Sequence, residues 1–196
     1  MTSAATYLKG RLLVAMPGIE DPRFERAVVF ICAHDEDHAM GLTLNRPIEG
    51  LTVSKLLSRL KVKTPAKSLT PADPLENLVI MGGPVEPERG FVLHTDDYAG
   101  EPSGSLVREG VMLTATREIL EALAGGEPHP RRAIMLLGYA GWDAGQLERE
   151  IRHNVWLTCE PDEALLFGDD HEHKWSRALA KIGVAAEHLS AQAGQA

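Results

Sequence analysis

Polar residues follow the ends of several predicted strands, and these positions hold side chains that could bind or react. The motif LNRP places Asn45 and Arg46 directly before a proline, which lacks the N–H that strand pairing needs. An asparagine beside an arginine could hold a carboxylate or a phosphate, because the guanidinium group offers two parallel donors. We favour a structural alternative, in which Asn45 bonds the backbone of the turn and Arg46 pairs with a structural carboxylate.

The motif GGPVE follows another predicted strand and begins with Gly82 and Gly83. Glycine allows a ligand to approach the backbone closely, so that exposed N–H groups could act as donors. The same pair could instead form a tight turn or a bulge with unusual backbone angles. The turn or bulge is the interpretation that we favour.

Histidines end two predicted strands, at His34 and His94. Either could be a catalytic base or a metal ligand, although a hydrogen-bonded structural histidine is the favoured interpretation. In the segment DDHEH, Asp169, His171 and His173 resemble a metal-binding cluster. Because aspartate and histidine also cap helices, we interpret this segment as a solvated loop before a helix. The sequence therefore predicts no metal and no cofactor.

The two cysteines, Cys32 and Cys159, are too few for a disulfide framework. Cys32 lies within an apolar run, where a thiol is usually inert. A bridge between the two cysteines stays open as an alternative, since both lie in predicted strands. The sequence also lacks the G-x-S-x-G motif of a serine nucleophile. These observations argue against a recognisable nucleophilic enzyme.

The stretch GYAGWDAGQLE (residues 138–148) is a glycine-rich turn that leads into a predicted helix. With Asp143 as N-cap, Gln146 takes the place of the acceptor in a capping box, and Trp142 and Leu147 form a hydrophobic staple. A phosphate loop is disfavoured, because the P-loop pattern is absent and Asp143 would repel an anion. Capping leaves Tyr139 unexplained, and a well-fixed corner can also line a cleft.

Periodicity and turn residues predict the elements that position these side chains. Short apolar and β-branched runs predict strands, the second and third forming a hairpin, at residues 11–16, 27–34, 40–45, 77–83, 90–95, 132–141 and 155–160. Helical spacing and cap residues predict helices at residues 51–60 (N-cap Thr52), 113–126 (N-cap Thr114), 146–154, 161–168 and 173–183. Residues 61–77, 84–89 and 96–105 are interpreted as connections. The irregular order predicts a mixed α+β or irregular α/β domain.

Length and charge exclude several classes of protein. The chain of 196 residues suits one domain, or one domain with a lobe. Its net charge of −8 and the lack of a Lys/Arg run disfavour direct nucleic-acid binding, which depends on cations that neutralise phosphates. No stretch approaches the ~20 apolar residues of a membrane span, and no signal peptide is recognised. We expect a cytoplasmic protein with reduced thiols.

Several stretches occur in an order that resembles one family. They are YLKGRLLVAMPGIEDPRFERAVVFICAH, AMGLTLNRPI, MGGPVEPERGFVLH, LLGYAGWDAGQLEREIRHNVWL and KWSRALAKIGV. In combination, from about Leu8 to the C-terminus, they resemble the AlgH/YqgE family of bacterial proteins. The resemblance implies an α+β single domain with a mixed, bifurcated β-sheet, partly closed into a small barrel and surrounded by helices. Residues 8–189 would form this domain, with residues 1–7 loosely ordered and residues 190–196 a frayed tail.

The resemblance implies little about activity, because the family has no established biochemical reaction. We expect a non-enzymatic regulatory protein that binds a small ligand or a protein partner. Its strand-end residues should then line one cleft: Asn45, Arg46, Gly82, Gly83, His94, Tyr139 and Trp142. One alternative is an enzyme acting on a small anionic substrate, with His34 or His94 as base and Arg46 as anchor. Another is a transcriptional regulator that acts indirectly. The sequence identifies neither the ligand, nor the partner, nor the oligomeric state.

Overall fold

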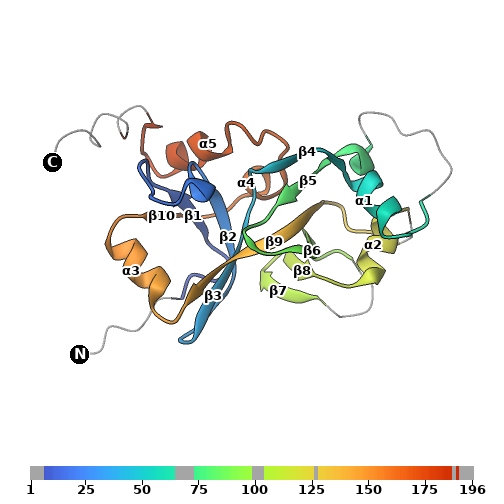
Figure 1. Ribbon diagram of the computed structural model, residues 1–196, viewed down its shortest axis with the longest axis horizontal. Helices are drawn as coiled ribbons and strands as arrows, with labels where there is room; N and C mark the ends of the chain where they lie inside the picture. The colour runs from blue at the N-terminus through green and yellow to red at the C-terminus, as the bar shows by residue number, and fades with distance from the viewer. Residues whose placement is uncertain (1–6, 65–72, 99–103, 126–127, 187–188, 190–196) are drawn as a thin grey trace. The chain divides into compact units, whose positions relative to one another are not determined.

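A computed structural model describes residues 7–64, 73–98, 104–125, 128–186 and 189. The chain groups into two compact units, one formed by Met1–Asn45 with Tyr139–Ala196 and the other by Arg46–Gly138. We call them unit 1 and unit 2 and describe each by itself. Both combine strands with short helices, so the α+β class predicted from the sequence is confirmed (Figure 1).

Unit 1 is built on antiparallel strands in the order β10-β1-β2-β3-β9. These strands are β1 (Leu12–Ala15), β2 (Val28–His34), β3 (His38–Thr43), β10 (Trp156–Cys159) and the last part of β9 (Ala133–Asp143). β2 and β3 form the predicted hairpin. Leu12 lies opposite both Cys159 and Phe30, which places these three side chains on one face of the sheet.

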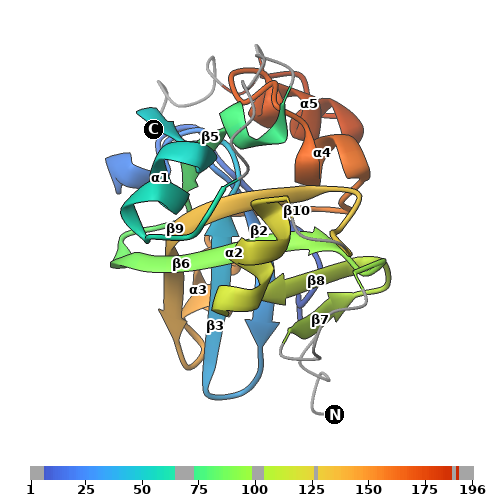
Figure 2. The ribbon, with the colours of Figure 1, turned by 90° about the vertical axis from the view of Figure 1, so that its right-hand side faces the viewer.

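Helices cover both faces of this sheet (Figure 1, Figure 2). α3 (Gln146–Arg152) packs on the face of Leu13, with Leu147 in the same apolar cluster. On the face of Leu12, α5 (Lys174–Lys181) buries Leu179, and the Cys159 thiol donates to Ala178 O at 3.7 Å. Two shorter helices complete the unit, namely the 3-10 helix η1 (Pro22–Phe24) and α4 (Glu163–Phe167).

Unit 2 holds two branches of strands that meet at the first part of β9. In one branch, β5 (Leu78–Met81) pairs in parallel with β9 and antiparallel with β4 (Pro47–Thr52). In the other, β9 is followed in the sheet order by β6 (Val85–Thr95), β8 (Val111–Thr114) and β7 (Ser105–Arg108). The mixed, bifurcated sheet with a curled, half-barrel part is thereby confirmed (Figure 2).

Two helices, α1 (Val53–Arg59) and α2 (Arg117–Leu123), and the 3-10 helix η2 (Pro74–Glu76) accompany these strands. They share a buried apolar cluster made of Leu51, Val53, Leu56, Leu57, Val62, Leu75, Val79, Ala124 and Met135. Thr52 is the N-cap of α1, as predicted, because its hydroxyl accepts a hydrogen bond from Lys55 N–H.

Two predicted helix caps are wrong. Asp143 ends β9, and Gly145 is the N-cap of α3 at φ 68°, a left-handed conformation that glycine adopts without steric cost. Half of the expected capping box is kept, since Gln146 Oε1 accepts from Asp143 N–H at 3.0 Å. Thr114 lies in β8, and Thr116 is the N-cap of α2.

Several strands lie where the sequence predicts connections or helix. Residues 85–89 belong to β6, although the prolines and charges of PVEPER predict a connection. β4, β7 and β8 are likewise missing from the prediction. Their short sequences carry a weak pattern, and pairing with neighbouring strands decides their structure.

Two further expectations concern a disulfide bridge and membrane-spanning segments. Cys32 and Cys159 are both free and buried, so the alternative of a bridge between them is not realised. None of the helices in the part of the chain that the structure describes is long and apolar enough to cross a membrane.

Candidate functional site

The seven predicted site residues are divided between the two units. Unit 1 contains Asn45, Tyr139 and Trp142, and unit 2 contains the others: Arg46, Gly82, Gly83 and His94. The convergence of all seven on one cleft stays a prediction. The residues within each unit, however, can be placed.

Three of the four residues in unit 2 meet at one corner. Met81 N–H donates to Arg46 O at 2.7 Å, and Gly82 N–H donates to Leu137 O at 2.8 Å. Gly138 has φ 71°, and a Cβ atom there would lie 2.4 Å from Gly83 O. The motifs LNRP, GGPVE and LLG therefore contact one another through backbone atoms, although they are far apart in the sequence.

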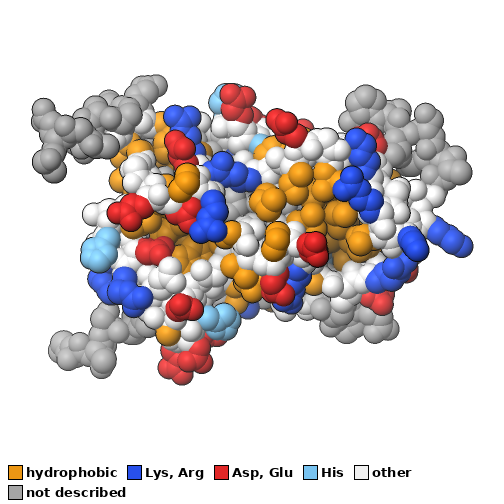
Figure 3. All heavy atoms as spheres, in the orientation of Figure 1, with side chains coloured by type: hydrophobic (Ala, Val, Ile, Leu, Met, Phe, Trp, Pro, Cys, Tyr) orange, Lys and Arg blue, Asp and Glu red, His pale blue; other side chains and the backbone are white. Residues whose placement is uncertain are grey.

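Large apolar side chains are exposed on the two strands that meet at this corner. Leu78, Met81 and Val85 are 36%, 38% and 37% exposed. Leu78 and Met81 belong to β5, and Val85 begins β6 after the two glycines. Hydrophobic side chains gather over the position of β5 in this orientation (Figure 3). We call Leu78, Met81 and Val85 the β5–β6 apolar patch.

His94 lies near the opposite end of β6 from this patch and is buried. Its Nδ1 lies 2.8 Å from Thr95 O and its Nε2 lies 2.9 Å from Thr114 Oγ1. Because a carbonyl oxygen only accepts, Nδ1 carries the proton and Nε2 accepts from the Thr114 hydroxyl. Burial lowers the pKa of His94, which favours this neutral form. The ring thus links β6 to β8.

His34, the other candidate base, is held in unit 1. Its Nδ1 accepts from Leu8 N–H at 2.9 Å, so its Nε2–H donates to Glu148 Oε1 at 3.0 Å. The ring of Tyr7 packs edge-on against it, with centroids 5.3 Å apart. Both ring nitrogens of His34 therefore fasten neighbouring segments of the chain.

Asn45 bonds the backbone of the turn. Its Oδ1 accepts from Val28 N–H and its Nδ2 donates to Arg26 O, both at 2.9 Å. Arg26, which sequence analysis missed, extends over the ring of Trp175, with its guanidinium carbon 5.4 Å from the ring centroid. No local pattern in PRFERA marks Arg26, since Trp175 is distant in the sequence.

Trp142 belongs to the core of unit 1, where it is 5% exposed. Its indole N–H and that of Trp156 both donate to Glu150 Oε2 at 2.8 Å, and Gln146 Nε2 donates to Glu150 Oε1 at 2.8 Å. One carboxylate thus orients two tryptophans and ties α3 to the sheet. Tyr139, four residues from the end of β9, is half-buried.

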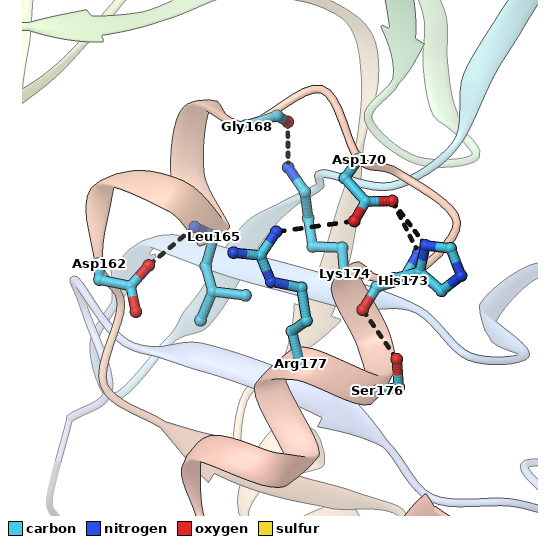
Figure 4. Close-up of polar contacts among 8 residues, drawn as sticks. All are labelled: Asp162, Leu165, Gly168, Asp170, His173, Lys174, Ser176 and Arg177. Carbon is cyan, nitrogen blue, oxygen red and sulfur yellow. Dashed lines mark hydrogen bonds and ion pairs between the residues drawn. The ribbon is translucent and has the colours of Figure 1, made fainter.

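The DDHEH segment forms the entry to α5 (Figure 4). Asp170 Oδ1 accepts from His173 Nδ1 at 2.8 Å, and Arg177 lies 3.7 Å from Asp170 Oδ2. The hydrogen bond that His173 donates to the Asp170 carboxylate raises the pKa of His173, whereas burial lowers the pKa of His171. Within the described ranges, no three His, Cys, Asp or Glu side chains are grouped so that they could hold a metal ion.

Lys174 begins α5 and is 2% exposed, which is unusual for a lysine. Its Nζ donates to Gly168 O at 2.9 Å and thereby ties the α4–α5 loop to the helix (Figure 4). Burial lowers the pKa of this amine to about 8. Lysines in such surroundings can act as nucleophiles, but this amine is enclosed by the protein.

The cysteine thiols are also enclosed. Burial raises the pKa of Cys32 to about 12, and burial raises the pKa of Cys159 as well. Because the thiolate is the reactive form, burial suppresses the reactivity of both side chains.

Known proteins resemble this chain over nearly its full length. A family described as AlgH-like matches residues 12–187. A UPF0301 protein of Caulobacter vibrioides is 61% identical over 97% of this chain and 94% of that protein. The solution structure of AlgH from Pseudomonas aeruginosa is 41% identical, with a TM-score of 0.74 and complete coverage of both chains. A crystal structure from Corynebacterium diphtheriae, 18% identical, shares the fold with a TM-score of 0.67 over 88% of this chain and 85% of that one.

Proposed function

The chain belongs to the AlgH-like family, and from that premise we propose that it is a cytoplasmic regulatory protein that acts by binding a protein partner rather than by catalysis. Membership of the family specifies the fold but not a reaction. The binding surface in this proposal is the β5–β6 apolar patch of unit 2.

The exposure of the patch carries the proposal. Three large aliphatic side chains, each more than a third exposed, belong to two strands that follow one another in the chain. Burying apolar surface yields roughly 25 cal/mol per Å², so a partner gains free energy by covering these side chains. A single exposed leucine needs no explanation, whereas several aliphatic side chains exposed on consecutive strands favour an interaction site.

The support beneath the patch is rigid. Met81 N–H and Gly82 N–H are both hydrogen-bonded to neighbouring segments, and the backbone of Gly138 packs against Gly83 O. A surface that is fixed before binding loses little conformational entropy when a partner docks. The glycines in this corner therefore serve the proposed binding indirectly, because they permit the close backbone crossing.

The size of the patch indicates the kind of partner. Three partly exposed side chains cover far less than the roughly 800 Å² that each protein contributes to a stable interface. A short segment of a partner, carrying aliphatic side chains, fits this area better than a second copy of the chain. We therefore expect a transient complex.

The candidate bases support binding over catalysis. A general base needs a ring nitrogen that can reach the proton of a substrate. In His34 and in His94, both ring nitrogens are engaged by other parts of the protein.

Photocrosslinking tests the proposal. A benzophenone amino acid placed at Met81 should give one discrete protein adduct in cells, whose mass identifies the partner. The matched control is the same residue at Leu60, which is 42% exposed at the end of α1 in the same unit. The purified partner should then bind the wild-type protein and lose most of its affinity for Val85→Asp. A signal equal at both positions, or binding that Val85→Asp leaves unchanged, would contradict the proposal.

A further inference from the structure

Arg26 in unit 1 combines a strained backbone with an exposed side chain. Its φ of 53° lies in the left-handed region, which residues other than glycine rarely adopt. Strain of this kind persists only where surrounding contacts impose it, and it is concentrated at ligand-binding and active sites. The contacts around Arg26 therefore indicate what the strain positions.

Asn45 imposes the conformation from the end of β3. Its amide donates to Arg26 O and accepts from Val28 N–H, each at 2.9 Å. It thus bridges the backbone on both sides of Ala27, whose own N–H donates to Phe24 O at 3.0 Å. Arg26 cannot relax to a normal φ without breaking these bonds, so its side chain leaves the backbone in a fixed direction.

Trp175 supports the other end of the side chain. The guanidinium carbon of Arg26 lies 5.4 Å from the centroid of the ring, within the range of a cation–π interaction. The ring is 7% exposed, and its Nε1–H donates to Ala15 O at 2.8 Å. A buried and hydrogen-bonded ring holds the guanidinium group in place.

The guanidinium donors of Arg26 remain available. Within the residues that the structure describes, they form neither a hydrogen bond nor an ion pair. Arg23, three residues earlier, differs in this respect, since its Nε and Nη2 donate to the Asp21 carboxylate at 2.9, 3.1 and 2.7 Å. Among the described residues, this turn thus presents one arginine that pairs with a carboxylate and one that does not.

From this geometry we infer that Arg26 anchors a binding site for a small oxyanion, a molecule recognised by its carboxylate or phosphate group. The planar fork of a guanidinium group matches two oxygen atoms of either group, and its fixed position lowers the entropic cost of binding. Unit 1 carries 16 Asp and Glu against nine Lys and Arg, so general attraction of anions does not supply this site. The inference concerns unit 1 and is independent of the β5–β6 apolar patch in unit 2.

Nuclear magnetic resonance titration tests the inference with two probes, inorganic phosphate and malonate. The signals of Arg26 Nε–H and of the Trp175 indole N–H should shift together and saturate with at least one probe. The probe that saturates identifies which of the two groups the site takes. Arg26→Lys keeps the charge without the fork, and its affinity should fall by roughly threefold to tenfold.

Arg26→Gly and Arg23→Ala form the matched pair of variants. Glycine adopts φ 53° without strain, so Arg26→Gly should fold normally and lose at least about tenfold in affinity. Arg23→Ala removes a neighbouring cation whose donors are occupied and should bind within about twofold of the wild type. Shifts that do not saturate with either probe, or that persist unchanged in Arg26→Gly, would overturn the inference. Equal losses in the two variants would do so too, since they would indicate general charge attraction.

Discussion

Replacing Lys174 with methionine should stabilise the protein at neutral pH and lose this advantage at alkaline pH. The side chain is 2% exposed, and its Nζ donates a hydrogen bond to Gly168 O at 2.9 Å. Burial lowers the pKa from its ordinary 10.5 to about 8, and the neighbouring charge of Arg177 acts in the same direction. The carboxylates of Asp169 and Asp170 oppose this shift without cancelling it.

The sign of the pH dependence follows from proton binding. Between pH 8 and 10.5 the unfolded chain holds the Lys174 proton more tightly than the folded protein does. The free energy of unfolding therefore rises with pH across this window. A shift of one pKa unit corresponds to about 1.4 kcal/mol. The shift of the Lys174 pKa from 10.5 to about 8 therefore means that the charged, buried amine costs about 3 kcal/mol of folding stability below pH 8.

Methionine removes this cost but leaves Gly168 O without its donor, a loss of about 1 kcal/mol. Lys174→Met should therefore gain about 2 kcal/mol at pH 7 and lose about 1 kcal/mol near pH 10.5, by the same balance. Urea unfolding followed by circular dichroism measures both values. Lys181→Met in the same helix is the control, since Lys181 is partly exposed and pairs with Asp162. A difference between Lys174→Met and wild type that stays constant over this pH range would refute the reasoning.

Three further substitutions and one labelling experiment test other contacts. Gly138→Ala should cost about 3 kcal/mol or more in urea unfolding, because its φ is 71° and its Cβ atom would meet Gly83 O at 2.4 Å. Gly50→Ala, with φ 72° and open space around it, should cost only about 1 kcal/mol, and equal costs would show that the backbone crossing is not tight. Glu150→Gln should cost about 2 kcal/mol and alter tryptophan fluorescence, because two indole N–H groups lose a charged acceptor. Cys32 should react with a thiol reagent at pH 8 only after unfolding, and rapid labelling of the native protein would contradict its enclosure.

Much of unit 1 could be predicted from the sequence, because its strands are continuous apolar runs. β1 is one residue shorter than predicted at each end, β2 is one residue shorter at its start, and the hairpin of β2 and β3 is confirmed. In unit 2, Thr52 was likewise identifiable as a cap, since a capping side chain bonds a backbone N–H only three positions away. Such features depend on neighbours in the chain, which a local pattern contains.

The strands of unit 2 were harder to predict, because their partners supply what the sequence lacks. Residues 85–89 of β6 contain prolines and charges, which locally favour a connection. Gly145 rather than Asp143 caps α3, because the path of the chain out of β9 requires a positive φ. The direction of the chain after β9 and the strands that pair with β6 depend on residues distant in the sequence. The local sequence of each segment therefore does not predict them.

The sequence by itself determined the family, the α+β class and the motifs that turn the chain. Only the tertiary structure decided which hydrogen-bond donors and acceptors of those motifs are bonded to other parts of the protein. Asn45 bonds the backbone beside Arg26, His34 bonds Glu148, and Trp175 bonds Ala15 across 160 positions of sequence. The physical reason is that a hydrogen bond depends on distance and direction in space, whereas a motif records only which residues are adjacent in the chain.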